Sequence, residues 1–250
     1  MAILYVAAER FELEPFAQLL TGLRKLKWPI AYAFEGIWEG RRVMLAANGA
    51  GPKLATQAVE VAIRAVTAAE LSASKLEAVV STGCCGALIP DLREGQIVVA
   101  TQVVNCATKE VFECTKVTTP HRVTYGLLAT QDRIASDSAE KHQLAHLGAV
   151  AVDMEAAGVA ARTQRAGLPF SCIKVVSDRL DESFGLDLNK MRTIEGRIAR
   201  GKIVLYTLTH PNLVPKLFSL NRRVNDASQQ LGDFLVSCRI NSEPDSPRAE

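Results

Sequence analysis

Apolar and polar positions along the chain predict strands that are followed by helices. A short apolar run at residues 2–7 is followed, from about Glu9, by apolar residues at helical spacing, which predicts a strand and then a helix. Residues 53–67 and 154–164 also have helical spacing, and each segment follows an apolar run. This alternation is typical of an α/β protein.

The remaining apolar runs extend the predicted sheet. They are residues 30–37, 42–47, 77–81, 97–104, 149–152 and 170–176. A turn at Glu39-Gly40 joins the first two of these into a hairpin, so the sheet contains antiparallel as well as parallel neighbours. We therefore expect a three-layer α/β/α sandwich around a mixed central sheet.

The C-terminal part of the chain has a different pattern. Residues 191–230 are predicted to be mostly helical, with breaks at Pro211 and Pro215. Residues 241–250 are polar and contain proline, which predicts a disordered tail. Without internal repeats or low-complexity segments, residues 1–240 are expected to form a single domain.

Composition excludes several classes of protein. The 250 residues carry 29 Lys plus Arg against 27 Asp plus Glu, a net charge of +2, so there is no broad basic field for a nucleic acid. No apolar run reaches the ~18 residues of a membrane span, and no secretory signal begins the chain. Six cysteines are too sparse for a disulfide scaffold. We expect a soluble, cytoplasmic protein without a membrane span.

Two glycine turns follow apolar strands, one with Gly49 and Gly51 and the other with Gly83 and Gly86. Glycine lets the backbone approach a ligand closely, and free amides at such a turn can bind an anion. An ordinary tight turn explains each one equally well. Leu54 occupies the last glycine position of a dinucleotide fingerprint that starts at Gly49, and no G-x-x-x-x-G-K is present, so NAD and ATP are disfavoured.

Other residues with potential chemistry are better explained as structural. His142 and His146 have the spacing of two zinc ligands, but Gln143 stands between them where a zinc protease has glutamate. A solvated helix face is the better interpretation, and we expect no metal. Cys84 and Cys85 are interpreted as small turn residues. No G-x-S-x-G elbow marks a nucleophilic serine.

Acidic residues follow two of the predicted strands. Asp153 and Glu155 come after one, and Asp178 and Asp181 come after another. A helix cap explains Asp153 and the helix dipole suits Glu155, yet neither effect predicts acidic residues after a second strand. Carboxyl groups at such strand ends can meet apolar walls that shift their pKa values, so this constellation is the strongest candidate site.

Four segments resemble, in the same order, landmarks of the purine nucleoside phosphorylase and methylthioadenosine/S-adenosylhomocysteine nucleosidase superfamily. They are the turns at residues 48–51 and 82–86 and the segments at residues 152–157 and 177–181. Residues 6–16 are similar to futalosine hydrolases in particular, and the helical end resembles hopanoid-associated phosphorylases. The resemblance implies an enzyme that cleaves the N-glycosidic bond of a nucleoside and releases the base.

The resemblance also implies roles for individual residues. Asp178 gives a proton or a hydrogen bond to N7 of the purine, Glu155 accepts hydrogen bonds from the ribose hydroxyls, and Met154 packs on the sugar. Ile134 lies on the purine, and its segment offers backbone groups to the edge of the base; an ordinary helix-start residue is the alternative. Ser177, Gly83 and Cys84 are also placed at the nucleoside.

The attacking group stays open between water and inorganic phosphate. A hydrolase needs a carboxylate that activates water, and Glu12 or Glu9 is the candidate, although either is also explained as an exposed charge on a first helical turn. A phosphorylase needs an anion pocket, for which Gly49, Gly51 and Cys84 are the candidates. Phosphate is therefore a possible co-substrate.

Two residues depart from the phosphorylase pattern. Ser81 stands where bacterial purine phosphorylases have a phosphate-binding arginine, although Lys53 beside the first turn can supply a positive charge. Cys84 replaces a serine or threonine, and a thiol is a poorer hydrogen-bond donor than a hydroxyl. A non-catalytic nucleoside-binding protein on the same fold is the alternative to an enzyme.

The resemblance further implies no metal or organic cofactor, and a homo-oligomer in which neighbouring subunits share the active site. The group on the 5′ carbon of the ribose stays open. Simple purine nucleosides, methylthioadenosine, futalosine and adenosylhopane all fit the motifs.

Overall fold

The computed structural model describes residues 1–68, 75–183, 188–191, 193 and 214–241, and its strands form a mixed sheet. The first strands are β1 (Ala2–Ala7), β2 (Thr21–Lys25), β3 (Tyr32–Trp38), β4 (Arg41–Ala47) and β5 (Leu76–Ser81). The others are β6 (Cys84–Ala87), β7 (Ile97–Asn105), β8 (Val111–Glu113), β10 (Thr124–Thr130), β11 (Ala149–Asp153) and β12 (Phe170–Asp178). Their order is β2-β3-β4-β1-β5-β12-β6-β11-β10-β7-β8, and β9 (Val117–Thr118) pairs separately with β13 (Arg239–Ile240).

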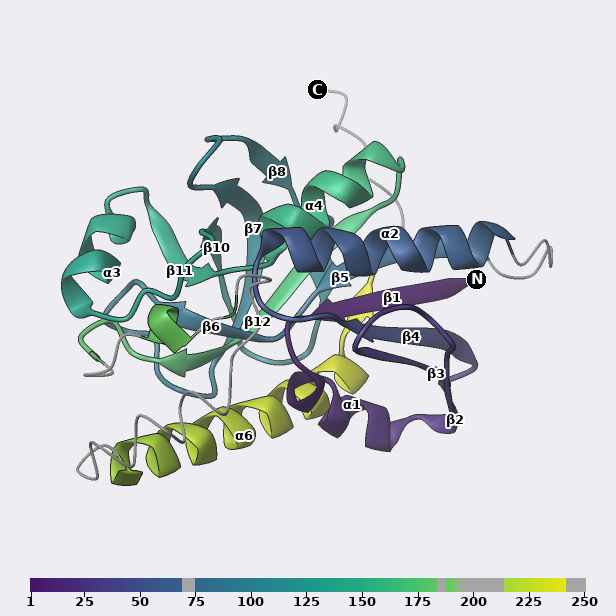
Figure 1. The fold of residues 1–250 in the computed structure, drawn as a ribbon, viewed down its shortest axis with the longest axis horizontal. Coiled ribbons are helices and arrows are strands. Elements are labelled where there is room, and N and C mark those ends of the chain that lie inside the picture. Colours follow the sequence, from purple (N-terminus) through teal and green to yellow (C-terminus); the bar gives the residue numbers. More distant parts are fainter. Residues whose placement is uncertain (69–74, 184–187, 192, 194–213, 242–250) are drawn as a thin grey trace.

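Helices cover both faces of the sheet, which gives three layers (Figure 1). The longer helices are α2 (Pro52–Ala68), α4 (Ala156–Arg165) and α6 (Val214–Ser237), and the shorter ones are η1 (Arg10–Glu12), α1 (Glu14–Leu19), α3 (Ser138–Ala145) and η2 (Leu188–Met191). α2 packs on α4 over one face, and α1 packs on α6 over the other. The predicted α/β/α sandwich with a mixed central sheet is confirmed.

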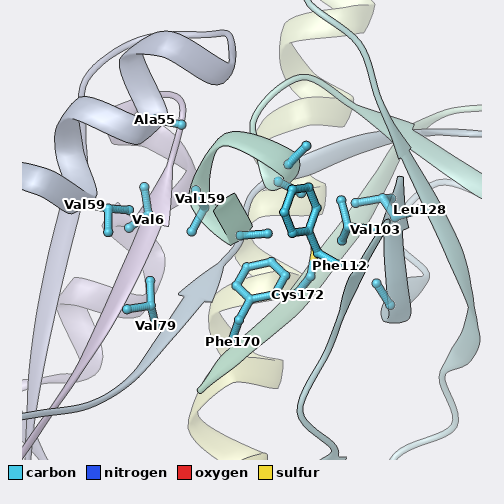
Figure 2. Close-up of a cluster of buried hydrophobic side chains, with 14 of the residues drawn as sticks. Val6, Ala55, Val59, Val79, Val103, Phe112, Leu128, Val159, Phe170 and Cys172 are labelled. Carbon is cyan, nitrogen blue, oxygen red and sulfur yellow. The ribbon is translucent and has the colours of Figure 1, made fainter. Parts of the chain in front are cut away.

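The sandwich has a hydrophobic core on each face of the sheet, and successive side chains of β1 point alternately into the two cores. Leu4 and Val6 face the cluster under α2 and α4, which Figure 2 shows with Val59 and Val159 beside Val6. Tyr5, between them in the sequence, faces the opposite cluster under α1 and α6. Because β1 is buried on both faces along its whole length, its sequence is a continuous apolar run.

The second half of the sheet curls back on itself. β7 pairs with β10 in parallel and with β12 antiparallel, so β12, β6, β11, β10 and β7 close a ring. Within this ring Gly86 of β6 pairs with Val152 on one side and with Asp178 on the other. The short strand β6 thus brings the ends of β11 and β12 together, although these two strands run in opposite directions.

Several local predictions are confirmed, and one turn is wrong. The strands predicted at residues 2–7, 42–47, 77–81, 97–104 and 170–176 and the helix at 53–67 are present within a few residues. Cys84 and Cys85 are not turn residues, because they begin β6. The turn is limited to Thr82 and Gly83, since the backbone pairs with β12 from Cys84 onward.

The expected break at Pro215 coincides with the start of α6, which begins at Val214. Pro215 lies in the first turn of α6, where the missing amide hydrogen leaves no helical hydrogen bond unmade. Pro211, most of the helix predicted at residues 191–230, and residues 242–250 of the predicted tail lie outside the residues that the structure describes. Strands β2, β8 and β10 were not predicted, because their segments show neither a continuous apolar run nor a clear alternation.

Within residues 1–68, 75–183 and 214–241, no helix is both long and apolar enough to cross a bilayer.

Close packing of α2 on α4 leads to a stability prediction. A Cβ atom at Gly158 of α4 would lie 2.3 Å from the Pro52 carbonyl oxygen of α2, so Gly158→Ala must push the helices apart. We expect the variant to lose about 1–3 kcal/mol of unfolding free energy in urea titrations. Gln164→Ala, at an exposed position of the same helix, is the control and should unfold like the wild type. Equal stability of both variants would contradict the close contact.

Candidate active site

A cavity of about 230 Å³ opens where β1, β6, β11 and β12 end. Five acidic residues are among those that line it, and they come from separate parts of the chain. They are Glu9, Glu12, Asp153, Glu155 and Asp178. Four of these are almost completely buried, Glu9 being the exception. Because buried carboxylates are costly unless they are hydrogen-bonded or protonated, the partners of each one define what the cavity can do.

Glu12 reaches the cavity from η1, directly after β1. Its Oε1 accepts a hydrogen bond from the backbone amide of Cys84 at 2.7 Å, and its Oε2 accepts one from the amide of Glu9 at 2.8 Å. A Cβ atom at Gly83, where φ is +111°, would lie 2.6 Å from Oε1. A side chain at position 83 would collide with the Glu12 carboxylate, so the second turn requires glycine at this position.

Glu155 lies at the start of α4 and is held by the first glycine turn. The amide of Gly51 donates to its Oε1 at 2.9 Å. Burial raises the pKa of Glu155 to about 8, with the charges of Asp153 and Glu12 adding to the rise. Burial thus favours the protonated side chain, whereas hydrogen-bond donors from a ligand would favour its ionised form.

Asp153 is the structural member of the set. Its Oδ2 accepts from the amide of Ala156 at 2.9 Å and caps α4, and the same atom lies 2.8 Å from Nζ of Lys174. Its Oδ1 accepts from the Thr130 hydroxyl at 2.6 Å. Although burial acts to lower the pKa of Lys174, the Asp153 charge raises it above its ordinary value, so Lys174 keeps its proton. Asp153 has little capacity left for a ligand.

Asp178 ends β12 between a hydroxyl and a buried ammonium. Its Oδ1 lies 2.7 Å from the Ser177 hydroxyl, and its Oδ2 lies 2.5 Å from Nζ of Lys141. Burial raises the pKa of Asp178, and the Lys141 ammonium opposes that rise. The expected neutral acid is therefore consistent with its burial, but it has a cationic neighbour that sequence reasoning missed.

The segment around Ile134 differs from its expected arrangement. The Ile134 side chain lines the cavity, as the resemblance implies. Its amide, however, donates to Oδ1 of Asn189 at 2.8 Å, and its carbonyl accepts from Nδ2 of Asn189 at 3.0 Å. Both backbone groups expected at the edge of a base are thus bonded to a side chain of η2.

Further predicted residues lie at the same cavity. Met154, Ser177 and Cys84 all line it. Burial and the neighbouring Glu12 raise the pKa of the Cys84 thiol well above its ordinary value, so the thiol stays neutral. The Cys84 amide, already bonded to Glu12, is the more important polar group of this residue.

The groups proposed for phosphate are occupied or distant. The Gly49 amide donates to the Ala8 carbonyl at 2.8 Å, and the Gly51 amide is bonded to Glu155. Lys53 is exposed and does not line the cavity, and Ser81 is fully buried without lining it. The glycine turns thus bind carboxylates of the protein where an anion was considered.

Other acidic and histidine candidates lie outside the centre. Asp181 is exposed, its Oδ1 lies 3.4 Å from Nε2 of the exposed His142, and it does not line the cavity. His146 is also exposed, in agreement with a solvated helix face. Glu9 also lines the cavity but is itself partly exposed, whereas Glu12 is buried beside Cys84.

Sequence reasoning missed two lysines and one wall of the cavity. Lys174 could have been noticed, because a lysine within an apolar strand needs a buried partner. Lys141 has no such signal, since α3 shows no apolar face pattern. Leu220 and Val224 of α6 line the cavity together with Phe11, and only the fold brings this distant helix there.

Taken together, the cavity offers two buried carboxyl groups with raised pKa values, Asp178 and Glu155, and a third, Glu12, whose oxygens accept hydrogen bonds from two backbone amides. Among the described residues that line it, Arg133 is the one cation, and its largely exposed side chain pairs with Glu140 at 2.9 Å. Such a site suits a neutral ligand with hydroxyl groups and a basic nitrogen, because carboxyl groups accept hydrogen bonds from hydroxyls and can donate a proton to the nitrogen.

Comparison with known proteins identifies the class to which this fold and site belong. A family model, the phosphorylase superfamily, matches residues 3–120 and 106–205. The chain therefore belongs to the phosphorylase superfamily.

Particular members resemble the chain over most of its length. A 5′-methylthioadenosine/S-adenosylhomocysteine nucleosidase of Actinobacillus succinogenes is 27% identical over 227 residues, which cover 79% of this chain and 94% of the relative. The corresponding nucleosidase structure from S. pneumoniae has a TM-score of 0.70 at 17% identity, covering 95% of this chain and 97% of that one. Futalosine hydrolase of Helicobacter pylori has a TM-score of 0.68 at 18% identity, covering 95% and 96%. These structures share the fold of this chain.

The burial of Glu155 predicts a pH-dependent stability. Its pKa is about 8 in the folded protein and about 4.5 when exposed, so the folded state binds more protons than the unfolded state between these values. The unfolding free energy should therefore fall as pH rises from about 4.5 to about 8. Glu155→Gln removes this contribution, and the wild type should lose stability relative to the variant across that range. If the difference in unfolding free energy between the wild type and Glu155→Gln is the same at every pH, a raised pKa of Glu155 is contradicted.

Proposed function

We propose that this protein hydrolyses the N-glycosidic bond of a purine nucleoside, with or without a modified 5′ group, and releases the free base. The observation that carries this proposal is the meeting of Glu12, Glu155 and Asp178 at one cavity. Membership of the phosphorylase superfamily and the similarity to curated and solved nucleosidases support it.

Each of the three carboxyl groups has one role in the proposed reaction. Bond cleavage leaves negative charge on the purine and positive charge on the ribosyl group. Asp178 gives a proton to N7 of the base, which a buried and neutral acid can do. Glu155 accepts hydrogen bonds from the ribose hydroxyls, and in its ionised form it stabilises the cationic sugar. Met154 packs its thioether against the sugar, and Ile134 packs on the base.

Glu12 is the residue that we assign to the attacking water. The Cys84 and Glu9 amides fix its carboxylate, and these hydrogen bonds favour the ionised form that accepts a proton from water. Glu12 is the better candidate than Glu9 because it is buried at the cavity beside Cys84, whereas Glu9 contributes its amide to holding Glu12.

Hydrolysis is favoured over phosphorolysis by the partners of the glycine turns. The amides of Gly49, Gly51 and Cys84 are bonded to protein oxygens, so they do not form the anion pocket that a phosphate would need. A carboxylate at Glu12, where the attacking group would lie, would also repel a phosphate. Water is neutral and needs no such pocket.

Release of base in the absence of phosphate tests the reaction. A panel of purine nucleosides is incubated with the protein in phosphate-free buffer containing a chelator, since the proposed groups need no metal or organic cofactor. We expect free base and free ribose, at an initial rate that added inorganic phosphate leaves unchanged. Formation of ribose 1-phosphate at a rate that rises with phosphate would show a phosphorylase. Binding without release of base would show the non-catalytic alternative.

Substitution of the water-activating residue gives a sharper prediction. Glu12→Gln should lower kcat by about 10²–10⁴-fold, because the amide cannot take a proton from water, while KM changes little. Glu14→Gln is the matched control, since Glu14 lies two residues away and pairs with Arg10 outside the cavity. Both kinetic constants of this control should stay near the wild-type values. A Glu12→Gln enzyme with wild-type kcat would remove Glu12 from this role.

We also propose that the protein is a homo-oligomer that shares its active site between subunits, as members of this superfamily lead us to expect. Val111 of β8 and Tyr125 of β10 support a contact surface, because each of these large apolar residues is about half exposed. Light scattering of the purified protein tests the proposal. A mass equal to that of one 27.1 kDa chain at all concentrations would contradict it.

A further inference from the structure

Lys141 of α3 is a fully buried lysine behind the proposed acid. Its side chain has no exposed surface, and a buried ammonium is costly unless its charge and all its N–H groups are matched. Nζ lies 2.5 Å from Oδ2 of Asp178, 2.5 Å from the Arg179 carbonyl oxygen and 3.3 Å from the Glu182 carbonyl oxygen. Three acceptors thus match the three N–H groups.

These contacts keep Lys141 away from a bound substrate. Lys141 is not among the residues that line the cavity, whereas Asp178 is. The two carbonyl oxygens belong to the loop after β12, so the ammonium joins α3 to that loop as well as to the acid. Among these contacts of Lys141, the one with a residue that lines the cavity is therefore the contact with Asp178.

The two oxygens of Asp178 have different partners. Oδ2 accepts from the ammonium, which leaves Oδ1 as the oxygen on which a proton is favourable. Oδ1 lies 2.7 Å from the Ser177 hydroxyl, and the same hydroxyl lies 3.2 Å from the Cys85 carbonyl oxygen. Ser177 has one hydrogen to donate. If it donates to Cys85, its oxygen can accept from a protonated Oδ1, and the whole chain of hydrogen bonds is satisfied.

Other charged and titratable groups near Asp178 come from the loop after β12 and from α6, β6 and the start of α4. Glu182, in the loop after β12, is paired with Arg223 of α6, so its negative charge is largely compensated. Cys85 of β6 contributes a thiol whose pKa burial raises well above its ordinary value, and it stays neutral. Glu155 of the facing helix start shares the cavity. Lys141 is the cation in direct contact with the Asp178 carboxyl group.

We propose that Lys141 is a positioning residue for the acid, which holds Oδ2 of Asp178, directs its proton to Oδ1 and stabilises the carboxylate that remains after proton transfer. This inference rests on the proposed hydrolysis. As the bond between C1′ and N9 breaks, its electron pair passes to the purine, and the proton on Oδ1 forms the N7–H bond. Water adds to C1′ and gives a proton to Glu12.

The Lys141 ammonium stabilises the carboxylate that a buried Asp178 leaves when it gives up its proton. A carboxyl group in this environment holds its proton tightly, because the carboxylate that it would leave is poorly solvated. A good acid must also release the proton in the transition state. With Lys141 at 2.5 Å, the product carboxylate forms as one half of an ion pair, so burial and release become compatible.

Replacing Lys141 by methionine tests this role, since methionine is unbranched and adaptable in buried sites. The protonated Asp178 is followed by difference infrared spectroscopy of the ligand-free protein over pH, with Asp178→Asn as the reference that identifies its carbonyl band. In Lys141→Met we expect the band to persist to a pH about one to three units higher than in the wild type. The alkaline limb of the kcat profile should move the same way, and kcat on the plateau should fall roughly tenfold.

Two further variants complete the experiment. His142→Gln, at the next position of α3 with a solvated side chain, is the control and should titrate and turn over like the wild type. If Lys141→Met does not fold, Lys141→Gln retains a donor for the Arg179 carbonyl without the charge and is measured in the same way.

The outcomes separate this inference from the proposed hydrolysis. An unchanged titration of Asp178 in a folded variant overturns the role of Lys141, even where thermal stability and activity both drop, because that combination describes a structural residue. Absence of base release by the wild type at every pH overturns the hydrolysis instead, and the infrared titration still reports whether Lys141 controls the proton on Asp178.

Discussion

The structure depends on burying several carboxyl groups around one cavity and giving each a partner. Glu12, Glu155 and Asp178 lose most of their contact with water, and each would be prohibitively costly as an isolated charge. Two of them receive backbone amides from glycine turns, and the third receives the ammonium of Lys141. The strands, turns and helix starts that form the cavity are arranged so that these partners are available.

The same constraint determines the chemistry. An amide that satisfies a carboxylate of the protein is not available to an external anion, so the turns that could bind phosphate in another sequence here hold the acidic groups. The two kinds of partner differ in their effect, because backbone amides hold Glu12 whereas burial raises the pKa of Asp178. In the proposed mechanism Glu12 is the base for water and Asp178 is the acid for the leaving group, the pair that cleavage of a glycosidic bond requires.

Much of this arrangement could be predicted from the sequence, and the reasons for the failures are physical. The apolar periodicity predicts most of the sheet because buried strands such as β1 and β12 are continuous apolar runs. The acidic residues at positions 155 and 178 are visible because each follows such a run. Resemblance adds Glu12, which by itself looks like an exposed helical residue.

Long-range pairing could not be predicted. β6 is too short to have a period, yet its Gly86 brings Val152 and Asp178 together. Lys141 lies in a helix without an apolar face, and nothing local shows that its ammonium lies against residue 178. The bonds between Asn189 and Ile134 likewise join residues 55 positions apart, so the resemblance that implied backbone groups at the edge of the base could not show that Asn189 binds those of Ile134.

The most direct test of the central claim is a crystal structure of the Asp178→Asn variant with an intact purine nucleoside. The account predicts N7 of the base facing residue 178, the ribose hydroxyls on Glu155, and an ordered water between Glu12 and C1′. A nucleoside bound with its base directed away from residue 178, or an anion in place of the water at Glu12, would contradict it.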